Sequence, residues 1–402
     1  MNIAMLLLYY HPEKVSSFYL YDDIIEGLKK AGHHVHVITP NPVRGLNKDE
    51  RKVLKKTHME EIDSHLTIHR YYIPFDTDHS TLNRLIRSFF VSYKCAKKAI
   101  KLKIDAIYVQ SDPPIFYAYF ATKFAKRKKI PVIYNIQDLY PDILGVKRNL
   151  VFNILNQYQK KALLSATHTV LISEDIKYKV DHKVSSSIST SVIHNWNYAT
   201  QPLASKEIEN IFEKYAFTVT YAGNIGYMQN MNIIVSTAKL LSDYPEIHFL
   251  FIGDGAKKDI LLNEIKSLKN VSYYPKVDVK HSQAIYNLSS INLITLNEGV
   301  IYSASPSKTA SSLLAKKPIV ACVDESSSYA KMITNNNIGL VVNPNHPEHL
   351  KDAILSIYHK KKTFDIESYN KLHNLLYNRE KNVSLYVDLF NRYQKRDEID
   401  AI

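Results

Sequence analysis

Short apolar runs alternate with longer amphipathic segments along the whole chain. This alternation is typical of βαβ units, in which helices join buried parallel strands. A first series of apolar runs predicts strands at 2–9, 34–39, 105–110, 131–136 and 168–172, with a helix over 18–31 that ends at Gly32. A second series predicts strands at 216–222, 247–252, 291–296, 318–323 and 338–342. The pattern therefore predicts an α/β protein with two Rossmann-like domains.

A polar stretch separates the two series. It runs from Asn195 to about Glu209, contains Pro202 and lacks a strong periodicity. The length of 402 residues suits two domains of about 150–200 residues each. We expect an N-terminal domain over 1–198, a C-terminal domain over 199–365, and a helix over 366–402 that crosses back onto the first domain. Ligands of such sheets bind beyond the carboxyl ends of the strands, so the expected active site is a cleft across which the two sheets face each other.

Cysteine usage and apolar runs narrow the class of protein. Cys95 and Cys322 are far apart and belong to no Cys/His cluster, which argues against a disulfide scaffold or structural zinc and fits a reducing cytosol. Residues 1–10 are expected to form a buried first strand rather than an export signal, and no run of 18 apolar residues predicts a membrane span. We expect a cytoplasmic protein, with peripheral attachment to the inner face of the membrane as a further possibility.

Charge favours an acidic partner. The formal net charge of +13 suits phosphorylated substrates, anionic lipid or nucleic acid, and charge alone does not choose among them.

Two glycine turns follow predicted strands in the second half. Gly223 and Gly226 stand in one turn, before a helix expected near Asn230, and Gly253-Asp254-Gly255 forms the other. Glycines there would let the backbone approach a ligand, and the helix N-terminus would favour a phosphate. Each turn taken alone could equally be an ordinary strand-to-helix connection.

The segment from Ser305 to Thr309 precedes an apolar helix. Pro306 can open that helix, and Ser305 or Ser307 can cap it. Lys308 would then lie in the first turn, where the helix dipole disfavours a cation unless an anion such as a diphosphate binds nearby. The alternative is a solvated lysine.

Polar residues end two strands of the first half. Asn135, Gln137, Asp138 and Asp142 follow one strand, and Asp112 follows another. Carboxylates at these positions could orient hydroxyl groups or act as a base, and they could equally be caps or turn formers.

A basic segment with interleaved aromatic residues lies at 84–103. It contains no acidic residue, and it suits either an interfacial membrane anchor or an ordinary helix with a solvated face. Read as a helix, it places Leu85, Phe89, Ser92, Ala96 and Ala99 near one face that would pack on a sheet. The candidate contacts for an acceptor or a membrane are Arg84, Arg87, Lys94, Lys97 and Lys98.

Taken together, these motifs resemble the family-4 retaining glycosyltransferases, in the branch of bacterial capsule, O-antigen and exopolysaccharide enzymes that includes N-acetylfucosaminyl transferases. The resemblance spans nearly the whole chain and rests on Gly32-His33-His34-Val35, Pro42-Val43-Arg44-Gly45, Gln137-Asp138 with Pro141-Asp142, Asn195-Trp196, Tyr221 to Gly226 with Gln229, Gly253-Asp254-Gly255 and Pro306-Ser307-Lys308. It implies a GT-B fold, an acceptor domain followed by a nucleotide-sugar domain, and no bound metal or cofactor. The implied donor is a nucleotide diphosphate sugar, with UDP as the family's commonest carrier, and the implied acceptor is a lipid-linked or polysaccharide precursor.

The resemblance also supplies the candidate site residues. Those expected to bind the donor are Gly223, Asn224, Gly226, Gln229, Gly253, Asp254, Lys276, Ser307, Lys308, Thr309 and Ser311. Those expected near the reacting sugar are Asp112, Gln137 and Asp138.

The chain departs from the family at charged positions. Family members commonly carry an Arg and a Lys where this chain has Asn224 and Gln229, and two glutamates where it has Ser303 and Ser311. Gln137 stands where a histidine is common. Lys308 thus becomes the principal expected neutraliser of the diphosphate.

Three other functions fit parts of the pattern. An inactive GT-B partner subunit would explain the missing charges, and a UDP-sugar 2-epimerase can share the fold but would need more carboxylates and histidines. A nucleic-acid-binding protein would explain the charge and the 29 tyrosines, but no zinc spacing or RNA-binding strand motif supports it. The leading hypothesis is a retaining sugar transferase with no nucleic-acid partner.

Overall fold

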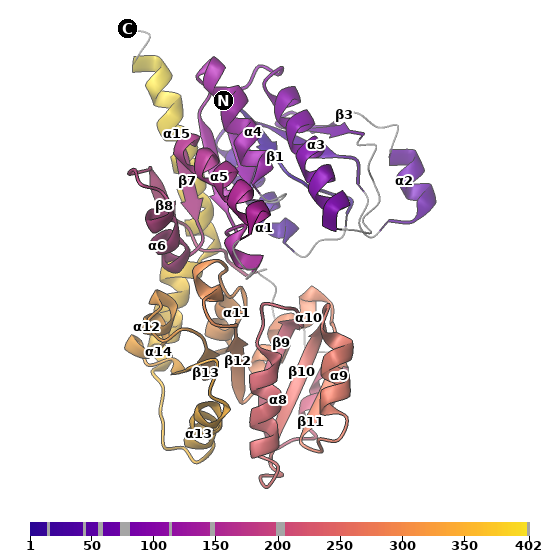
Figure 1. Cartoon of the computed structure of the whole chain (residues 1–402), viewed down its shortest axis with the longest axis vertical. Coiled ribbons are helices and arrows are strands. Elements are labelled where there is room, and N and C mark those ends of the chain that lie inside the picture. Colours follow the sequence, from indigo (N-terminus) through magenta and orange to yellow (C-terminus); the bar gives the residue numbers. More distant parts are fainter. Residues whose placement is uncertain are drawn as a thin grey trace. The chain divides into compact units, whose positions relative to one another are not determined.

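The computed structural model describes residues 1–13, 17–42, 46–54, 59–72, 81–111, 115–144, 149–197 and 206–399. The chain forms two compact units (Figure 1). Unit 1 combines Met1–His194 with Arg379–Ile402, and unit 2 comprises Asn195–Asn378. Unit 1 is thus built from two separate stretches of chain.

The sheet of unit 1 has eight strands in the order β3-β4-β2-β1-β5-β6-β7-β8. All neighbours are parallel except β3, which pairs antiparallel with β4 at one edge. The strands are β1 (Asn2–Leu6), β2 (His34–Pro40), β3 (Met59–Asp63), β4 (Leu66–Tyr71), β5 (Ala106–Gln110), β6 (Val132–Ile136), β7 (His168–Leu171) and β8 (Thr190–Val192). The apolar pattern predicted five of these strands and missed the edge strands β3 and β8, and also β4, which lies next to β3.

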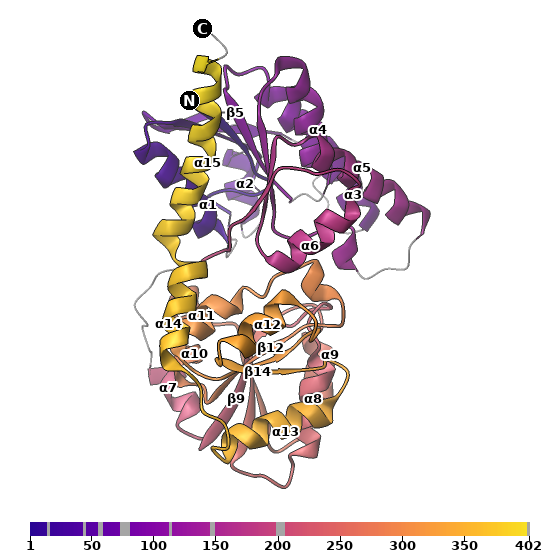
Figure 2. The same cartoon turned by 90° about the vertical axis from the view of Figure 1, so that its left-hand side faces the viewer.

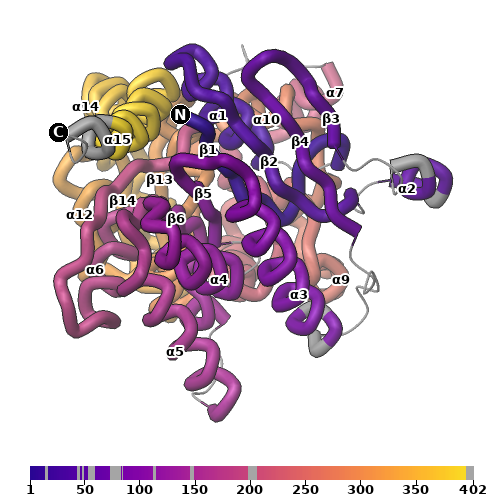
Figure 3. The backbone as a smooth tube through the Cα atoms, turned by 90° about the horizontal axis from the view of Figure 1, so that it is seen from above, coloured from indigo at the N-terminus to yellow at the C-terminus, as the bar shows by residue number. Residues whose placement is uncertain are grey.

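Helices cover both faces of this sheet. Figure 3 shows α1 (Phe18–Lys30) and α15 (Arg379–Ile399) together on one side of the strands. On the other side, α4 (Phe116–Ala125) packs between α3 (Thr81–Ala99) and α5 (Leu150–Ser165). The remaining helical segments are α2 (Lys48–Leu54), α6 (Glu174–Lys183), η1 (Lys126–Lys128) and η2 (Asp142–Leu144).

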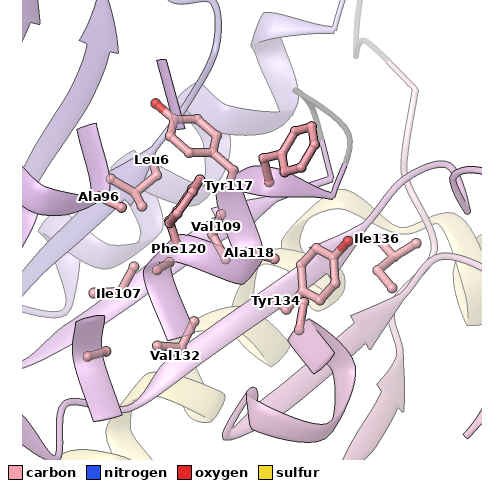
Figure 4. Close-up of a cluster of buried hydrophobic side chains, with 14 of the residues drawn as sticks. Leu6, Ala96, Ile107, Val109, Tyr117, Ala118, Phe120, Val132, Tyr134 and Ile136 are labelled. Atoms are coloured by element: carbon pink, nitrogen blue, oxygen red, sulfur yellow. The ribbon is translucent and has the colours of Figure 1, made fainter. Parts of the chain in front are cut away.

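Alternate strand residues build the core beneath α3 and α4 (Figure 4). Leu6, Val109 and Tyr134 belong to this cluster together with Ala96 of α3 and Phe120 of α4. Ser92, Ala96 and Ala99 of α3 are buried as the sequence predicted, and their small size lets the helix lie close to the sheet. The prediction for Phe89 was wrong, because its side chain is 38% exposed and packs edge-on against α4 rather than on the sheet.

The last helix completes unit 1. The Tyr386 hydroxyl accepts a hydrogen bond from Asn135 Nδ2, and Arg379 Nε donates to Asp23 at 2.8 Å. A Cβ on Gly27 of α1 would lie 2.4 Å from a Val383 methyl group, so a glycine is needed for α15 to approach α1 this closely. The residues expected to start this helix belong elsewhere, since 366–377 form α14 (Ile366–Leu372) and η4 (His373–Tyr377) in the core of unit 2.

The sheet of unit 2 has six parallel strands in the order β11-β10-β9-β12-β13-β14. They are β9 (Phe217–Asn224), β10 (Ile247–Asp254), β11 (Val271–Pro275), β12 (Ile291–Thr295), β13 (Ile319–Cys322) and β14 (Gly339–Val342). The sequence predicted all of them except the edge strand β11.

Its helices also lie on both faces. One cluster joins the sheet to α8 (Met231–Leu240), α9 (Lys258–Ile265) and α13 (Pro347–Tyr358), and α8 packs against α13 (Figure 2). The other face is covered by α7 (Lys206–Phe212), α10 (Val279–Leu288), α11 (Lys308–Ala315), α12 (Ser328–Asn335) and α14, with η3 (Val300–Tyr302) beside them.

We predict that Gly253→Ala destabilises unit 2. The new Cβ would lie 1.9 Å from the carbonyl oxygen of Gly223, so neighbouring strands would have to separate. Overpacking of this kind costs about 1–3 kcal/mol. Thermal melting measures the loss, and Ala at the exposed Asp243 of the same unit is the matched control. Equal melting temperatures for both variants would contradict the prediction.

Candidate functional site

Three loops of unit 2 lie at the carboxyl edge of its sheet, after the adjacent strands β9, β10 and β12. The first contains Gly223 to Gly226, the second contains Gly253 to Gly255, and the third leads from β12 to α11. Parallel sheets bind ligands at this edge. The loops therefore contain most of the donor-binding residues predicted from the sequence.

The two glycine turns are packed directly on each other. Asp254 accepts a backbone hydrogen bond from Ile225 at 2.8 Å, and Ile225 accepts one from Lys257 at 2.9 Å. A Cβ on Gly255 would lie 2.3 Å from the Ile225 carbonyl oxygen. Gly253 and Gly255 are therefore required by the contact between the turns themselves, a reason that the sequence did not reveal.

Lys308 reaches across the first turn from α11. Its Nζ donates to the Tyr221 hydroxyl at 2.9 Å and lies 4.1 Å from the centre of the Tyr221 ring. A Cβ on Gly223 would lie 2.5 Å from Lys308 Cε, so the lysine occupies the space that the glycine leaves. Tyr221 in turn donates to the carbonyl oxygen of Asn224 and so ties the lysine to the turn.

The electrostatic setting of Lys308 is unfavourable for a cation. Its side chain is largely buried, and no carboxylate among the described residues forms an ion pair with it. Burial lowers the pKa of its ammonium group to about 7. The position at the first residue of α11 adds the positive end of the helix dipole. These conditions favour an anion near Lys308 Nζ.

The helix start differs in detail from the prediction. The helix begins at Lys308, two residues after the expected Pro306, and Ser307 occupies the N-cap position without a side-chain capping bond. Thr309 Oγ1 donates to the Pro306 carbonyl oxygen at 2.8 Å and lies 2.9 Å from the Tyr329 hydroxyl. Thr309 is thus fully buried beneath the loop, whereas Ser307 is exposed.

The two amides at the family's Arg and Lys positions contact each other. Asn224 Nδ2 donates to Gln229 Oε1 at 3.2 Å above Gly226, where a Cβ would lie 2.5 Å from Asn224 Nδ2. The helix after this turn begins at Met231, and Asn230 caps it by accepting from the Ile233 amide. The turn therefore offers uncharged hydrogen-bonding groups, and Lys308 supplies the charge beside it.

The remaining predicted donor residues are less closely grouped. Asp254 is exposed and lies 3.9 Å from Lys258, and Lys276 is exposed directly after β11. The Ser311 carbonyl oxygen on α11 accepts from Gln283 Nε2 at 3.0 Å. The Tyr221 side chain had no role predicted from the sequence. The only signal for it was an aromatic residue two positions before the first glycine.

Polar groups also gather at the carboxyl edge of β5 and β6 in unit 1. Ser111 Oγ accepts from the backbone amides of Gln137 at 3.1 Å and Asp138 at 3.4 Å. Gln137 Nε2 donates to Asn135 Oδ1 at 2.6 Å, and Asn135 is held by Tyr386 of α15. The structure thus fixes the Gln137 amide through a chain of hydrogen bonds from α15.

The carboxylates at this edge of the unit 1 sheet differ in their surroundings. Asp142, predicted as a second carboxylate of this edge, forms ion pairs with Lys183 and with Lys179 at 3.7 Å, so its charge has a structural role. Asp138 is partly buried. Asp112 lies outside the described residues.

The predicted basic surface on α3 is partly wrong. Arg87 is only 7% exposed, so it cannot meet a membrane or an acceptor, because the inner face of α3 carries it into the protein. Lys94 Nζ donates to the Tyr72 carbonyl oxygen, while Lys97 and Lys98 are exposed and lie over the rings of Tyr93 and Tyr71. The side chain of Arg84 is outside the described part of α3.

Among the described residues, no group of three or more His, Cys, Asp or Glu side chains is placed to hold a metal ion. No described helix combines the length and hydropathy needed to cross a bilayer.

Comparison with known proteins links both units to sugar transfer. A sequence model described as "Glycosyltransferase Family 4" matches residues 20–196, and one described as "Glycosyl transferases group 1" matches residues 204–382. The chain is 26% identical over 282 residues to the probable glycosyltransferase WbjE of Pseudomonas aeruginosa, covering 66% of this chain and 68% of WbjE. It is 24% identical over 327 residues to WcaI of Escherichia coli K12, a putative colanic acid biosynthesis glycosyl transferase, covering 77% and 80%.

The fold has relatives among solved structures. The structure of HepE from Anabaena in complex with UDP and glucose superposes with a TM-score of 0.66, at 14% identity, over 98% of this chain and all of HepE (100%). At this identity the likeness shows the fold alone.

We predict that Lys308→Met stabilises the protein in the absence of ligand. The pKa of this lysine is about 7 in the folded protein, against an ordinary value of 10.5 that applies to the unfolded chain. Between these two pH values the unfolded chain therefore binds more protons than the folded protein. Native stability contributed by this group therefore rises with pH above 7 and is lowest below it. The gain in the free energy of unfolding should be largest below about pH 7 and should shrink by about 1 kcal/mol per pH unit toward pH 9, as melting experiments at a series of pH values would show. Lys331→Met, at an exposed position of α12, should show no such trend, and a pH-independent gain for Lys308→Met would refute the assignment.

Proposed function

This chain is a glycosyltransferase of family 4 with the GT-B fold, which transfers a sugar from a nucleotide sugar, and from that premise we propose the following donor, acceptor and residue roles. The donor is a UDP-sugar, and the acceptor is a lipid-linked or polysaccharide precursor at an anionic membrane surface. Transfer retains the anomeric configuration, as in the bacterial branch that includes N-acetylfucosaminyl transferases. The relatives support this proposal through colanic acid biosynthesis in the name of WcaI and UDP in the HepE complex.

The observation that carries the proposal is the setting of Lys308. A diphosphate bound over the turn from Gly223 to Gly226 would meet the ammonium group, the start of α11 and the amides of Asn224 and Gln229. The ammonium group would gain a counter-charge that no described carboxylate supplies. Positioning and electrostatic stabilisation of the leaving diphosphate then account for most of the rate enhancement.

In unit 1, the proposed roles are orientation rather than proton removal. Gln137 and Asp138 stand at the carboxyl edge of β6 and would contact hydroxyl groups of the reacting sugars. In this mechanism the leaving diphosphate oxygen accepts the acceptor proton, so the site needs no strong side-chain base.

Thermal-shift measurements with UDP-, GDP- and dTDP-sugars test which nucleotide the donor carries. A ligand present at about 100 times its Kd stabilises the folded protein by about 2.7 kcal/mol. We expect the UDP-sugars to give the largest shift. A larger shift with GDP- or dTDP-sugars would replace the proposed nucleotide.

We predict that Lys308→Met weakens UDP-sugar binding by about 1.5–3 kcal/mol, the scale of a charged hydrogen bond. Affinity of the wild-type protein should also fall as pH rises above about 7, because the lysine must take up a proton to pair with the diphosphate. Isothermal titration with a UDP-sugar is suitable, since a diphosphate esterified at both ends has no phosphate proton that titrates in this range. Lys331→Met is the matched charge control.

A second substitution tests whether the effect is electrostatic. Gln229→Lys in the Lys308→Met background places an ammonium group on the glycine turn, where other family members carry one. It should restore part of the lost affinity. Full affinity in Lys308→Met alone would end the assignment of Lys308 to the diphosphate.

A further inference from the structure

The helices α3, α4 and α5 cover one face of the unit 1 sheet, and none of them contains an aspartate or glutamate. Their basic residues are Arg84, Arg87, Lys94, Lys97, Lys98, Lys123, Lys160 and Lys161. On the opposite face, α1 carries Asp22, Asp23 and Glu26 as well as Lys29 and Lys30, so its charges nearly balance. Positive charge is therefore concentrated on the α3–α4–α5 side of unit 1.

Large apolar side chains are exposed on the same side. On α3, Phe90 is 46% exposed. On α5 and just before it, Leu150 is 75%, Ile154 48% and Leu144 53% exposed. Exposed apolar groups collected on neighbouring helices mark an interaction surface.

Ring contacts join the three helices beneath this surface. Phe89 of α3 packs edge-on against Phe116 of α4 at 5.4 Å, and Phe116 packs against Tyr158 of α5 at 5.7 Å. Ile154 lies one helical turn before Tyr158 on the same face of α5. An aromatic row with the buried Phe116 at its centre thus links α3, α4 and α5 beneath the exposed residues.

Charge and apolar groups are separated along the helices. Most of the exposed apolar residues lie in the first halves of α3 and α5, with Leu164 and Tyr93 as exceptions, while Lys97, Lys123 and Lys161 lie in later turns. These lysines stand over the rings of Tyr93, Tyr119 and Tyr158 at 5.5, 5.6 and 5.9 Å. Lysines of this kind keep the charge in water while their stems cover apolar surface.

The apolar end adjoins the candidate site of unit 1. Helices α4 and α5 follow β5 and β6, so their first turns lie at the carboxyl edge of the sheet. Gln137 and Asp138 stand at the same edge, and Leu144 comes only a few residues after them.

We propose that the α3–α4–α5 surface, defined by Ile86, Phe89, Phe90, Leu144, Leu150, Val151 and Ile154 with Lys97, Lys123 and Lys161, inserts into the interface of an anionic bilayer. The apolar side chains enter the boundary between headgroups and acyl chains, and the lysines contact anionic headgroups. This surface refines the membrane contact of the proposed function and replaces the basic face of α3 as its site. It places the carboxyl edge of unit 1 beside the lipid surface, where a lipid-linked sugar would be presented.

Charge complementarity selects the bilayer over a protein partner. Lysines beside an apolar patch, on three helices that carry no acidic residue, match a continuous anionic surface, whereas a protein partner generally offers both signs of charge. A protein partner remains the competing outcome of the test.

Sedimentation of the full chain with vesicles tests the proposal. We expect binding to vesicles of phosphatidylcholine with phosphatidylglycerol, weak binding to phosphatidylcholine alone, and release by salt. The apolar variant Phe90→Ser/Leu150→Ser/Ile154→Ser should lose binding at least tenfold. The affinity of the basic variant Lys97→Gln/Lys123→Gln/Lys161→Gln for these vesicles should fall about fivefold for each lysine replaced.

A matched control removes the same charge elsewhere on unit 1. Lys30→Gln/Lys52→Gln/Arg392→Gln changes three exposed basic residues outside the surface and should reduce binding less than twofold. Equal loss in this control, unchanged binding in the apolar variant, or no binding of the wild-type protein at low salt would each overturn the proposal. Self-association that the apolar variant abolishes, without vesicle binding, would assign the surface to a protein contact instead.

Insertion of this surface into the bilayer can also be followed directly by fluorescence, with a variant that keeps an apolar side chain at position 90. The emission of Phe90→Trp should shift to the blue when vesicles with phosphatidylglycerol are added, while the buried Trp196 gives a constant background. An unshifted spectrum in a sample that sediments with vesicles would refute insertion. UDP-sugar binding depends on residues of unit 2, so its titration in the same variants separates failure of this surface from failure of the proposed donor site.

Discussion

The ammonium group of Lys308 stands beside the first glycine turn of unit 2 with no described carboxylate to neutralise it. Much of the local structure serves to hold it there. Gly223 leaves the room that the lysine stem occupies, and Tyr221 provides both a ring face and a hydroxyl oxygen. The turn after β10 packs on Gly223 through its own glycine. The unliganded protein thus accepts a stability cost at the position where a charged ligand would remove it.

The central strands and the glycine turns could be predicted from sequence, because buried parallel strands form continuous apolar runs. Strand β4 could not, since its Arg70 looks incompatible with a core. Arg70 is only 2% exposed because Glu60 of β3 pairs with it, and a partner across a hairpin leaves no signal in an apolar pattern. The prediction for Arg87 was wrong for a related reason, since periodicity located the inner face of α3 at Ser92 and Ala96 but not how far that face extends around the helix.

Some residues of the candidate site could also be predicted from the sequence, and others could not. Lys308 was identified because its charge conflicts with a helix start, which is a local rule. The role of Tyr221 depends on the distance between β9 and α11, and the link from Tyr386 to Gln137 depends on a contact between residues 251 positions apart, Asn135 and Tyr386. Such contacts exist only after folding. The site therefore combines locally encoded charge with side chains that the tertiary structure brings to it.

Unit 1 is discontinuous, and this affects how the chain can fold during synthesis. The ribosome makes all of Asn195–Asn378 before it makes Arg379–Ile399, although α15 provides Tyr386, Val383 and Arg379 to the core and surface of unit 1. The whole chain of unit 2 is therefore synthesised before unit 1 is complete. Until α15 arrives, the face of the first sheet that carries α1 is only partly covered, and Asn135 lacks its hydroxyl partner. The nascent N-terminal segment is therefore exposed to aggregation and chaperone binding for longer than its place in the sequence suggests.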